Sequence, residues 1–342
     1  MNASNSKKVR TLSRVPIVHA LRLRWALPLE VLVQSAAVEF WRCSSVLHLQ
    51  GLGPARSGAS MTWPHALKEL VLDSEGDMCL KHMTWPLSLE RLKFGARFNQ
   101  PIAGVVWPAS LKQLSLGHYF NQPIVEVVWP ASVRQLSFGW CFNQAIAGVE
   151  WPASLQQLLF GFGFNQPIAG VEWPASLQLL SFTGRFDQPL AEIAWPASLR
   201  RLSFGTSFNQ AIDCAGWPAS LQHISVGKKF NQPIAGVAWP DSLQQLSFGD
   251  DFNQPIAGVA WPASLQQLSF GYHFNQPIAV AIWPASLQQL SFGYWFNQAI
   301  VEVVWPPLLR HISFGTSFKK PVKGVAWPAS VRSVTRSGIN ML

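Results

Sequence analysis

The sequence predicts a mostly β repeat solenoid, in which each coil of 22 residues contributes one short parallel strand. Trp-Pro recurs at this spacing without a change of register, and the residues between successive copies are nearly identical. A fixed period of this length is typical of solenoids, whose units stack only on their neighbours. The repeated tryptophans are Trp63, Trp85, Trp107, Trp129, Trp151, Trp173, Trp195, Trp217, Trp239, Trp261, Trp283, Trp305 and Trp327.

Each unit follows the pattern WPASLQQLSFGxxFNQPIAGVx, where x is a variable residue. Leu268 and Phe270 alternate with Ser269, which is the period of two expected of a strand with one buried face. Twenty-two residues then leave room only for turns, short extended pieces or a 3₁₀ turn on the return side. The expected core of the unit that begins at Trp261 is Leu265, Leu268, Phe270, Phe274, Ile278 and, less strictly, Val280.

Three further repeated residues have expected structural roles. Glycine ends the strand in most copies, as at Gly271, and we expect it to adopt a left-handed backbone there. Asn275 and its equivalents should form a ladder that bonds backbone groups of their own and the adjacent turn. The tryptophans could form an aromatic ligand strip, but the invariant proline beside each one favours packing at a corner of the coil.

The motifs Leu-x-x-Leu-x-Phe, Gly-x-x-Phe-Asn-Gln-Pro-Ile and Pro-x-Ser-Leu resemble the FNIP repeat, a 22-residue relative of the leucine-rich repeat. The match covers about residues 85–330. Trp stands where that family usually has Leu before Pro, and Phe often replaces the last Leu of the strand. The resemblance implies an open, curved, leucine-rich-repeat-like solenoid with a parallel sheet on its inner face, serving in protein–protein interaction.

In that family an F-box, which recruits a ubiquitin ligase, often precedes the repeats. The segment from Leu27 to Leu32, LPLEVL, resembles the opening of an F-box, although the rest of the module is not recognisable. Two alternatives follow. The chain is either the substrate receptor of a ubiquitin ligase with a degenerate F-box, or its first residues cap the open end of the solenoid core.

The predicted organisation has three parts. Residues 1–60 form a basic N-terminal cap or extension, residues 61–330 a solenoid of about 12–13 repeats, and residues 331–342 a basic tail. Residues 1–60 and 306–342 each carry a net charge of +6, whereas the residues between them carry −3. Because a nucleic-acid groove needs positive charge along the solenoid, this distribution disfavours nucleic acid as a partner.

Cysteine usage and hydropathy indicate the compartment. Cys43, Cys79, Cys141 and Cys214 show no paired spacing and are expected to be free thiols in a reducing compartment. No apolar stretch is long enough for a transmembrane helix. We expect a cytoplasmic protein, with the nucleus as a second location. The acid-free, basic first residues leave organelle targeting as a further alternative.

The inventory of reactive residues predicts no enzyme. The histidines are scattered without metal-ligand spacing, and no phosphate-binding loop, dinucleotide fingerprint or nucleophile elbow is present. We therefore expect no catalytic residue, cofactor, metal or small-molecule substrate. The adjacent Asp250 and Asp251 face the equivalent Lys228 and Lys229 of the preceding coil, so an exposed ion pair between coils is expected.

Variation concentrates in the two positions between the strand-ending glycine and Phe-Asn-Gln, which we call the variable row. Its aromatic residues favour binding of a protein partner, since aromatics are enriched in interface hot spots. The alternative is drift at solvated positions in a recently expanded repeat protein without a settled partner. The candidate residues are Arg97, His118, Tyr119, Trp140, Phe162, Arg185, Lys228, Lys229, Asp250, Asp251, Tyr272, His273, Tyr294 and Trp295.

The outward-facing glutamines of the strands vary much less than this row. They are expected to form a polar floor that contributes little to specificity. These residues are Gln113, Gln135, Gln157, Gln245, Gln267 and Gln289.

Overall fold

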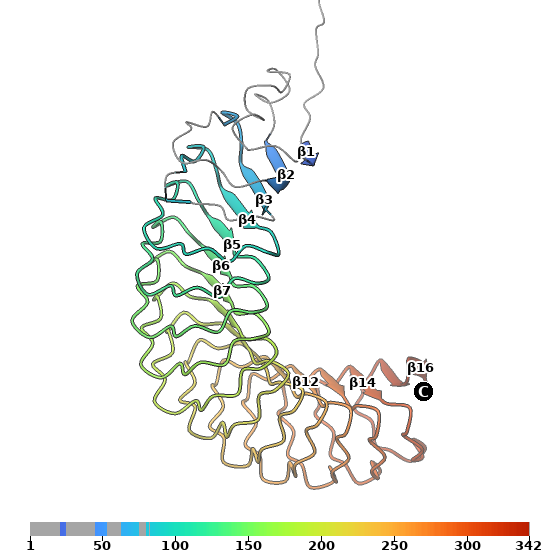
Figure 1. Cartoon of the computed structure of the whole chain (residues 1–342). Helices are drawn as coiled ribbons and strands as arrows, with labels where there is room; N and C mark the ends of the chain where they lie inside the picture. The colour runs from blue at the N-terminus through green and yellow to red at the C-terminus, as the bar shows by residue number, and fades with distance from the viewer. Residues whose placement is uncertain (1–20, 25–44, 53–62, 75–79, 82, 342) are drawn as a thin grey trace, which may run out of the picture.

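A computed structural model describes residues 21–24, 45–52, 63–74, 80–81 and 83–341 of the chain. The strands within these residues form one sheet of 16 strands, which follow one another in sequence order. The sheet lines the inner side of a curved solenoid, and the turns form its outer side (Figure 1). The described residues contain no helix. The predicted leucine-rich-repeat-like solenoid is therefore confirmed.

Within the described part of the chain, neighbouring strands are parallel from β1 to β15, and only β16 runs antiparallel to its neighbour. Most strands have three residues, of which the middle one is buried. The strands are β1 Leu21–Arg24, β2 Val46–Leu52, β3 Glu69–Ser74, β4 Arg91–Phe94, β5 Gln113–Ser115, β6 Gln135–Ser137, β7 Gln157–Leu159, β8 Leu179–Ser181, β9 Arg201–Ser203, β10 His223–Ser225, β11 Gln245–Ser247, β12 Gln267–Ser269, β13 Gln289–Ser291, β14 His311–Phe314, β15 Ser333–Arg336 and β16 Ile339–Asn340.

Stacked phenylalanines fill the core. Phe274 is 0% exposed, and its ring lies 6.0 Å from that of Phe252 and 6.1 Å from that of Phe296, nearly parallel to both. Phe270 of the same coil stacks on Phe274 at 4.1 Å. The predicted core residues Leu265, Leu268 and Ile278 are buried as well. A column of identical rings therefore runs along the solenoid, with one ring from each coil.

The prediction that Val280 is buried is wrong. Its side chain is 66% exposed, whereas the neighbouring Ala281 is buried. Val280 occupies the slot that Gly258 holds one coil earlier, and Ala281 occupies the slot of the buried Val259. This coil therefore has valine on the surface and alanine in the core.

The asparagine ladder is present as predicted. Asn253 Oδ1 accepts a hydrogen bond of 2.9 Å from the backbone N–H of Asn275, the equivalent residue of the next coil. Gln276 Nε2 also donates to the carbonyl oxygen of Asn253 at 2.9 Å and to its Oδ1 at 3.1 Å. Where Asp187 replaces asparagine, its carboxylate accepts the same bond from Asn209. The ladder thus satisfies turn amides that no strand reaches.

The glycines at the strand ends are needed for a different reason from the predicted one. Gly271 does not adopt a left-handed backbone; a Cβ atom there would lie 1.9 Å from the carbonyl oxygen of Gly249 in the preceding coil. Most of the left-handed glycines lie on the return side, as at Gly258 with a φ of 75°, whereas Gly184 lies in the variable row. Consecutive turns thus approach so closely that a side chain at the strand end is excluded.

Tryptophan packs at the corner of each coil. Trp283 is buried, and its ring is nearly parallel to that of Trp261, with 6.4 Å between the ring centroids. The ring of Phe270 lies 6.5 Å from that of Trp283 in a T-shaped arrangement. The Leu287 N–H donates to the carbonyl oxygen of Pro284, which closes the turn that follows the tryptophan. This geometry supports a packing role for the tryptophan column.

The sheet extends on both sides of residues 61–330. Before the first repeat, β2 pairs with β3, and Leu47 lies opposite Leu70 in the register. After the last repeat, β15 continues the parallel sheet. The F-box-like segment from Leu27 to Leu32 lies outside the described residues.

Phe274→Ala is expected to lower the free energy of unfolding by about 3–5 kcal/mol, because it removes one ring from a close-packed column. Urea denaturation of both proteins measures the change. Tyr119→Ala, which truncates an exposed aromatic residue, is the control and should cost less than about 1 kcal/mol. Equal costs for the two substitutions would contradict the assignment of Phe274 to the core.

Gly271→Ala should destabilise the chain by about 1–3 kcal/mol, because the added methyl group forces two backbones apart. Gly236→Ala is the matched control, since a Cβ atom there would meet no atom within 4 Å and its backbone is not left-handed. Its effect should stay within about 0.5 kcal/mol. Thermal or urea unfolding of the two variants and the wild type measures the difference in stability. A neutral Gly271→Ala substitution would show that the coils are not packed as described.

Candidate binding surfaces

The variable row occupies tight turns that follow the strands. In these turns the N–H of the second variable residue donates to the carbonyl oxygen of the first variable residue of the preceding coil. Examples are Tyr119 to Ala96 at 2.9 Å and Trp295 to Tyr272 at 2.9 Å. The backbone of the row is therefore fixed from coil to coil, and the variation affects side chains only.

An aromatic stack crosses the N-terminal half of the row. The rings of His118 and Trp140 lie 5.6 Å apart, and those of Trp140 and Phe162 lie 4.1 Å apart, nearly parallel in both pairs. Arg185 extends the stack, with its guanidinium carbon 6.0 Å from the Phe162 ring centroid. Tyr119 meets His118 at an angle and is 53% exposed. Four successive coils thus form one continuous stack.

A second cluster lies in the C-terminal half of the row. The rings of Tyr272 and Tyr294 stack at 4.8 Å, and Trp295 meets both rings nearly at right angles. His273 makes a similar edge contact with Tyr272 at 5.1 Å. Trp295 is 49% exposed.

Charged residues separate the two aromatic clusters. Lys228 Nζ lies 3.2 Å from Asp250 Oδ2, which confirms the expected ion pair between coils. Asp251 does not pair with Lys229; it lies 3.3 Å from His273 Nδ1 in the following coil. Both contacts are exposed, so each contributes at most about 1 kcal/mol. The row thus changes from positive charge at Lys228 and Lys229 to negative charge at Asp250 and Asp251.

Stacking limits what the row can offer to a ligand. The faces of Trp140 and Phe162 are covered by their neighbours, so their edges remain accessible. Tyr119 and Trp295 make only angled contacts with the rings beside them, and each is about half exposed, as Trp140 is. Arg97 is exposed in the turn that precedes the first cluster. The structure therefore distinguishes residues whose ring faces are covered by neighbours from residues that meet their neighbours at an angle, which the sequence alone does not do.

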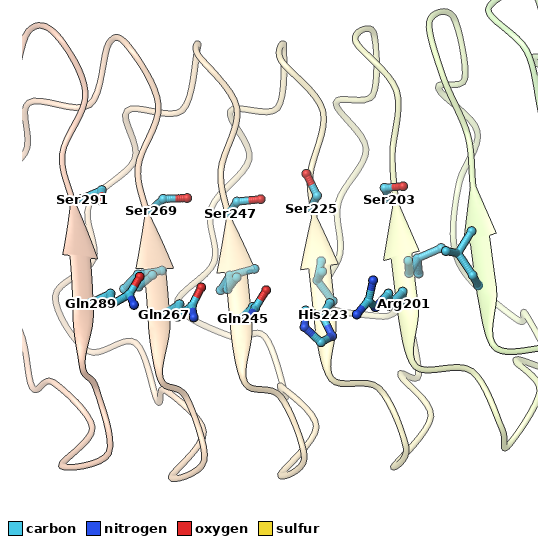
Figure 2. Close-up of a pocket in the computed structure, with 15 residues that line it drawn as sticks. Arg201, Ser203, His223, Ser225, Gln245, Ser247, Gln267, Ser269, Gln289 and Ser291 are labelled. Carbon is cyan, nitrogen blue, oxygen red and sulfur yellow. The ribbon is translucent and has the colours of Figure 1, made fainter. Parts of the chain in front are cut away.

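The concave sheet carries a second polar surface. A groove of about 340 Å³ runs over it between β8 and β13. Figure 2 shows two rows of side chains across these strands: serines from Ser203 to Ser291, and a second row that ends in Gln245, Gln267 and Gln289. Within the second row, Leu179, Arg201 and His223 replace glutamine on three successive strands.

This replacement is a functional signal that the sequence prediction of a uniform glutamine floor missed. The signal is visible in the sequence, because three neighbouring units change the same slot. Its importance depends on curvature, which places the slot at the floor of a groove.

Burial lowers the pKa of His223, the positive charge of Arg201 lowers it further, and hydrogen bonding with the Arg200 backbone works in the opposite direction. Figure 2 shows the guanidinium end of Arg201 extending towards His223 on the adjacent strand. The neutral imidazole is therefore the favoured form near neutral pH.

The described residues show two further features. No three His, Cys, Asp or Glu side chains among them are grouped so that they could hold a metal ion. The described part of the chain also contains no helix with the length and apolar character of a membrane span. Of the cysteines it includes, Cys141 is half-buried, Cys214 is exposed and both are free thiols.

The repeat architecture and these surfaces define a leucine-rich-repeat-like solenoid. The FNIP repeat model matches residues 98–141, 164–207, 208–251, 230–259 and 252–295, which together make up slightly more than half of the chain. The chain belongs to the FNIP repeat family.

One solved structure supports the same fold. CroV588, whose crystal structure is that of a circular leucine-rich-repeat protein, is 32% identical, with a TM-score of 0.71 over 92% of this chain and 53% of CroV588. The chain thus spans about half the length of that protein. An internalin from Listeria monocytogenes is 12% identical over 91% of this chain and 94% of its own, with a TM-score of 0.49. No curated protein sequence matches the chain.

The lowered pKa of His223 predicts a pH-dependent stability. The unfolded chain binds a proton at this residue near pH 6.5 and the folded chain only at lower pH, so stability falls as the pH drops through about 6.5. His223→Gln should remove this component, which is measured as a smaller difference between urea midpoints at about pH 7.5 and pH 5.5. An unchanged pH response would show that His223 titrates normally.

Proposed function

We propose that this chain is a non-enzymatic scaffold that holds a protein partner along the variable row. The observation that carries the proposal is a fixed backbone that presents different side chains, coil by coil, beside a constant framework. Such a surface changes its specificity without changing its fold. Repeat solenoids create extended binding surfaces in this way.

The two aromatic clusters suit a protein partner. Tyr119 and Trp295 present large apolar surfaces with few rotatable bonds, so ordering them on binding costs little conformational entropy. Stacking holds Trp140 and Tyr294 in place before the partner arrives. Rigid aromatic residues of this kind are typical hot spots.

The charged turns between the clusters would orient the partner. Lys229 is exposed, and no ion pair involves it among the described residues. Asp250 and Asp251 lie one coil further on. A partner that contacts both clusters must cross this change of sign, which favours one register over others more than it adds affinity.

Trp295→Ala combined with Tyr119→Ala should weaken binding of the partner by about 2 kcal/mol or more, which is roughly a 30-fold loss of affinity. The melting temperature should change little, because both side chains are about half exposed and neither belongs to the stacked columns of the core. The partner is first captured from the source cell with the wild-type chain by proximity labelling, and its affinity for both proteins is then measured.

Val304→Ala is the control, since Val304 is exposed on the return side, away from the row. It should bind the partner as the wild type does. Equal loss of binding in both variants would indicate nonspecific apolar contact. Wild-type affinity in the double variant would show that the residues of the variable row vary without selection for a partner. Capture of a ubiquitin-ligase adaptor through residues 1–60 would favour the F-box alternative.

A further inference from the structure

A chemically distinct patch lies at the N-terminal end of the concave groove and continues to Leu159 on β7, the strand just outside the groove. We define the central patch as Leu159, Leu179, Arg201 and His223. The last three replace glutamine in one row of the sheet, and Leu159 replaces serine in the neighbouring row. Both leucines are half-buried, so they are partly accessible on the outward face of their strands.

The register places these residues next to one another. Leu179 pairs with Arg201, and Arg201 pairs with His223, so the side chains lie on three adjacent parallel strands. Adjacent strands are about 4.8 Å apart. Along the row, the patch therefore changes from apolar to cationic within about 10 Å. Among the residues that the structure describes, none that lines the groove is acidic.

These side chains have the donors and acceptors that an extended peptide needs. Arg201 supplies only hydrogen-bond donors, arranged in a fork that matches a carboxylate. The flanking serine hydroxyls and glutamine amides both donate and accept, so they can bond peptide N–H and C=O groups. Leu159 and Leu179 add apolar contact beside the charged group.

Other anionic partners fit this surface less well. A bilayer is flat and cannot follow the concave side of a curved solenoid, on which the strands lie (Figure 1). Nucleic acid carries a phosphate at every nucleotide and requires cations along its path. Here the strand positions on one side of the patch, Gln245, Gln267 and Gln289, carry neutral glutamine and supply no cation.

We propose that the central patch binds an extended acidic peptide segment, with a carboxylate on Arg201 and His223 and an apolar side chain on Leu179. In an extended peptide, side chains two residues apart point the same way and are about 6.8 Å apart. The preferred segment therefore has an acidic and an apolar residue separated by one residue. This site lies on the sheet and does not depend on the proposed role of the variable row.

Protonation of His223 strengthens this binding. The groups that face it are Arg201 on β9 and Gln245 on β11, together with the carbonyl of Arg200. None of these neighbours carries a negative charge. A bound carboxylate supplies one and therefore favours the imidazolium form of His223. By linkage, affinity rises as the pH falls from about 7.5 to about 5.5, until the carboxylate of the peptide itself becomes protonated.

The test uses the full chain and a fluorescent peptide with three copies of Glu-Ser-Leu-Ser, followed by anisotropy. A second peptide with glutamine in place of glutamate is the neutral control. We expect the acidic peptide to bind at least about tenfold more tightly than the neutral one. Arg201→Gln should abolish this difference, and His223→Gln should remove the pH dependence.

Arg201→Gln and His223→Gln introduce the residue that the equivalent strand positions already carry, as at Gln245 and Gln267, so both variants are expected to fold. Arg134→Gln is the matched control, because it removes one exposed positive charge outside the groove. It should leave the peptide affinity unchanged within about twofold. Circular dichroism confirms that each variant is folded.

Several results would overturn the proposal. These are equal binding of the acidic and neutral peptides, wild-type binding by Arg201→Gln, or an equal loss of binding with Arg134→Gln. Displacement of the peptide by equimolar inorganic phosphate or by a short single-stranded RNA would show a general anion site. The Trp295→Ala variant should bind the peptide normally, so failure of this proposal and failure of the proposed function are distinguishable.

Discussion

The stacking of the Phe-Asn-Gln turn of one coil on that of the next is the interaction on which the whole structure depends. Asn253 bonds the backbone of Asn275 through Oδ1, while Phe252 and Phe274 stack beneath this bond. Gly249 and Gly271 allow the two turns to come this close. A single coil has no core of its own, so each unit is stable only when these contacts are made on both sides.

The same constraint determines which surfaces can vary. A substitution in the phenylalanine, asparagine or glycine columns disturbs two interfaces at once, whereas the variable row and the outward strand positions face solvent. Both of these surfaces rest on a framework that is fixed from coil to coil. A binding site on rigid elements keeps its geometry, because its supporting contacts are already made. The repeat thus provides two independent surfaces on one backbone, one beside the sheet and one on it.

The two surfaces differ in the chemistry that they offer. The row presents aromatic edges interrupted by the exposed Lys228–Asp250 pair, which suits a folded partner with matching apolar and charged areas. The concave groove presents amides, hydroxyls and one cationic centre at Arg201, which suits an extended chain. Membership of the FNIP repeat family accounts for the fold that both surfaces share. The proposed specificity of each surface rests on the side chains that differ between coils.

The sequence by itself determined the solenoid, the one strand per coil, the burial of Phe274 and the asparagine ladder, because a strict period forces equivalent residues into equivalent environments. Only the tertiary structure decided that Gly271 excludes a side chain, that Val280 is exposed, that Trp140 is covered on its faces, and that Arg201 lies in a groove. Each of these depends on the distance and curvature between coils. The period of a sequence specifies which residues are equivalent, whereas their separation in space follows from how the coils pack.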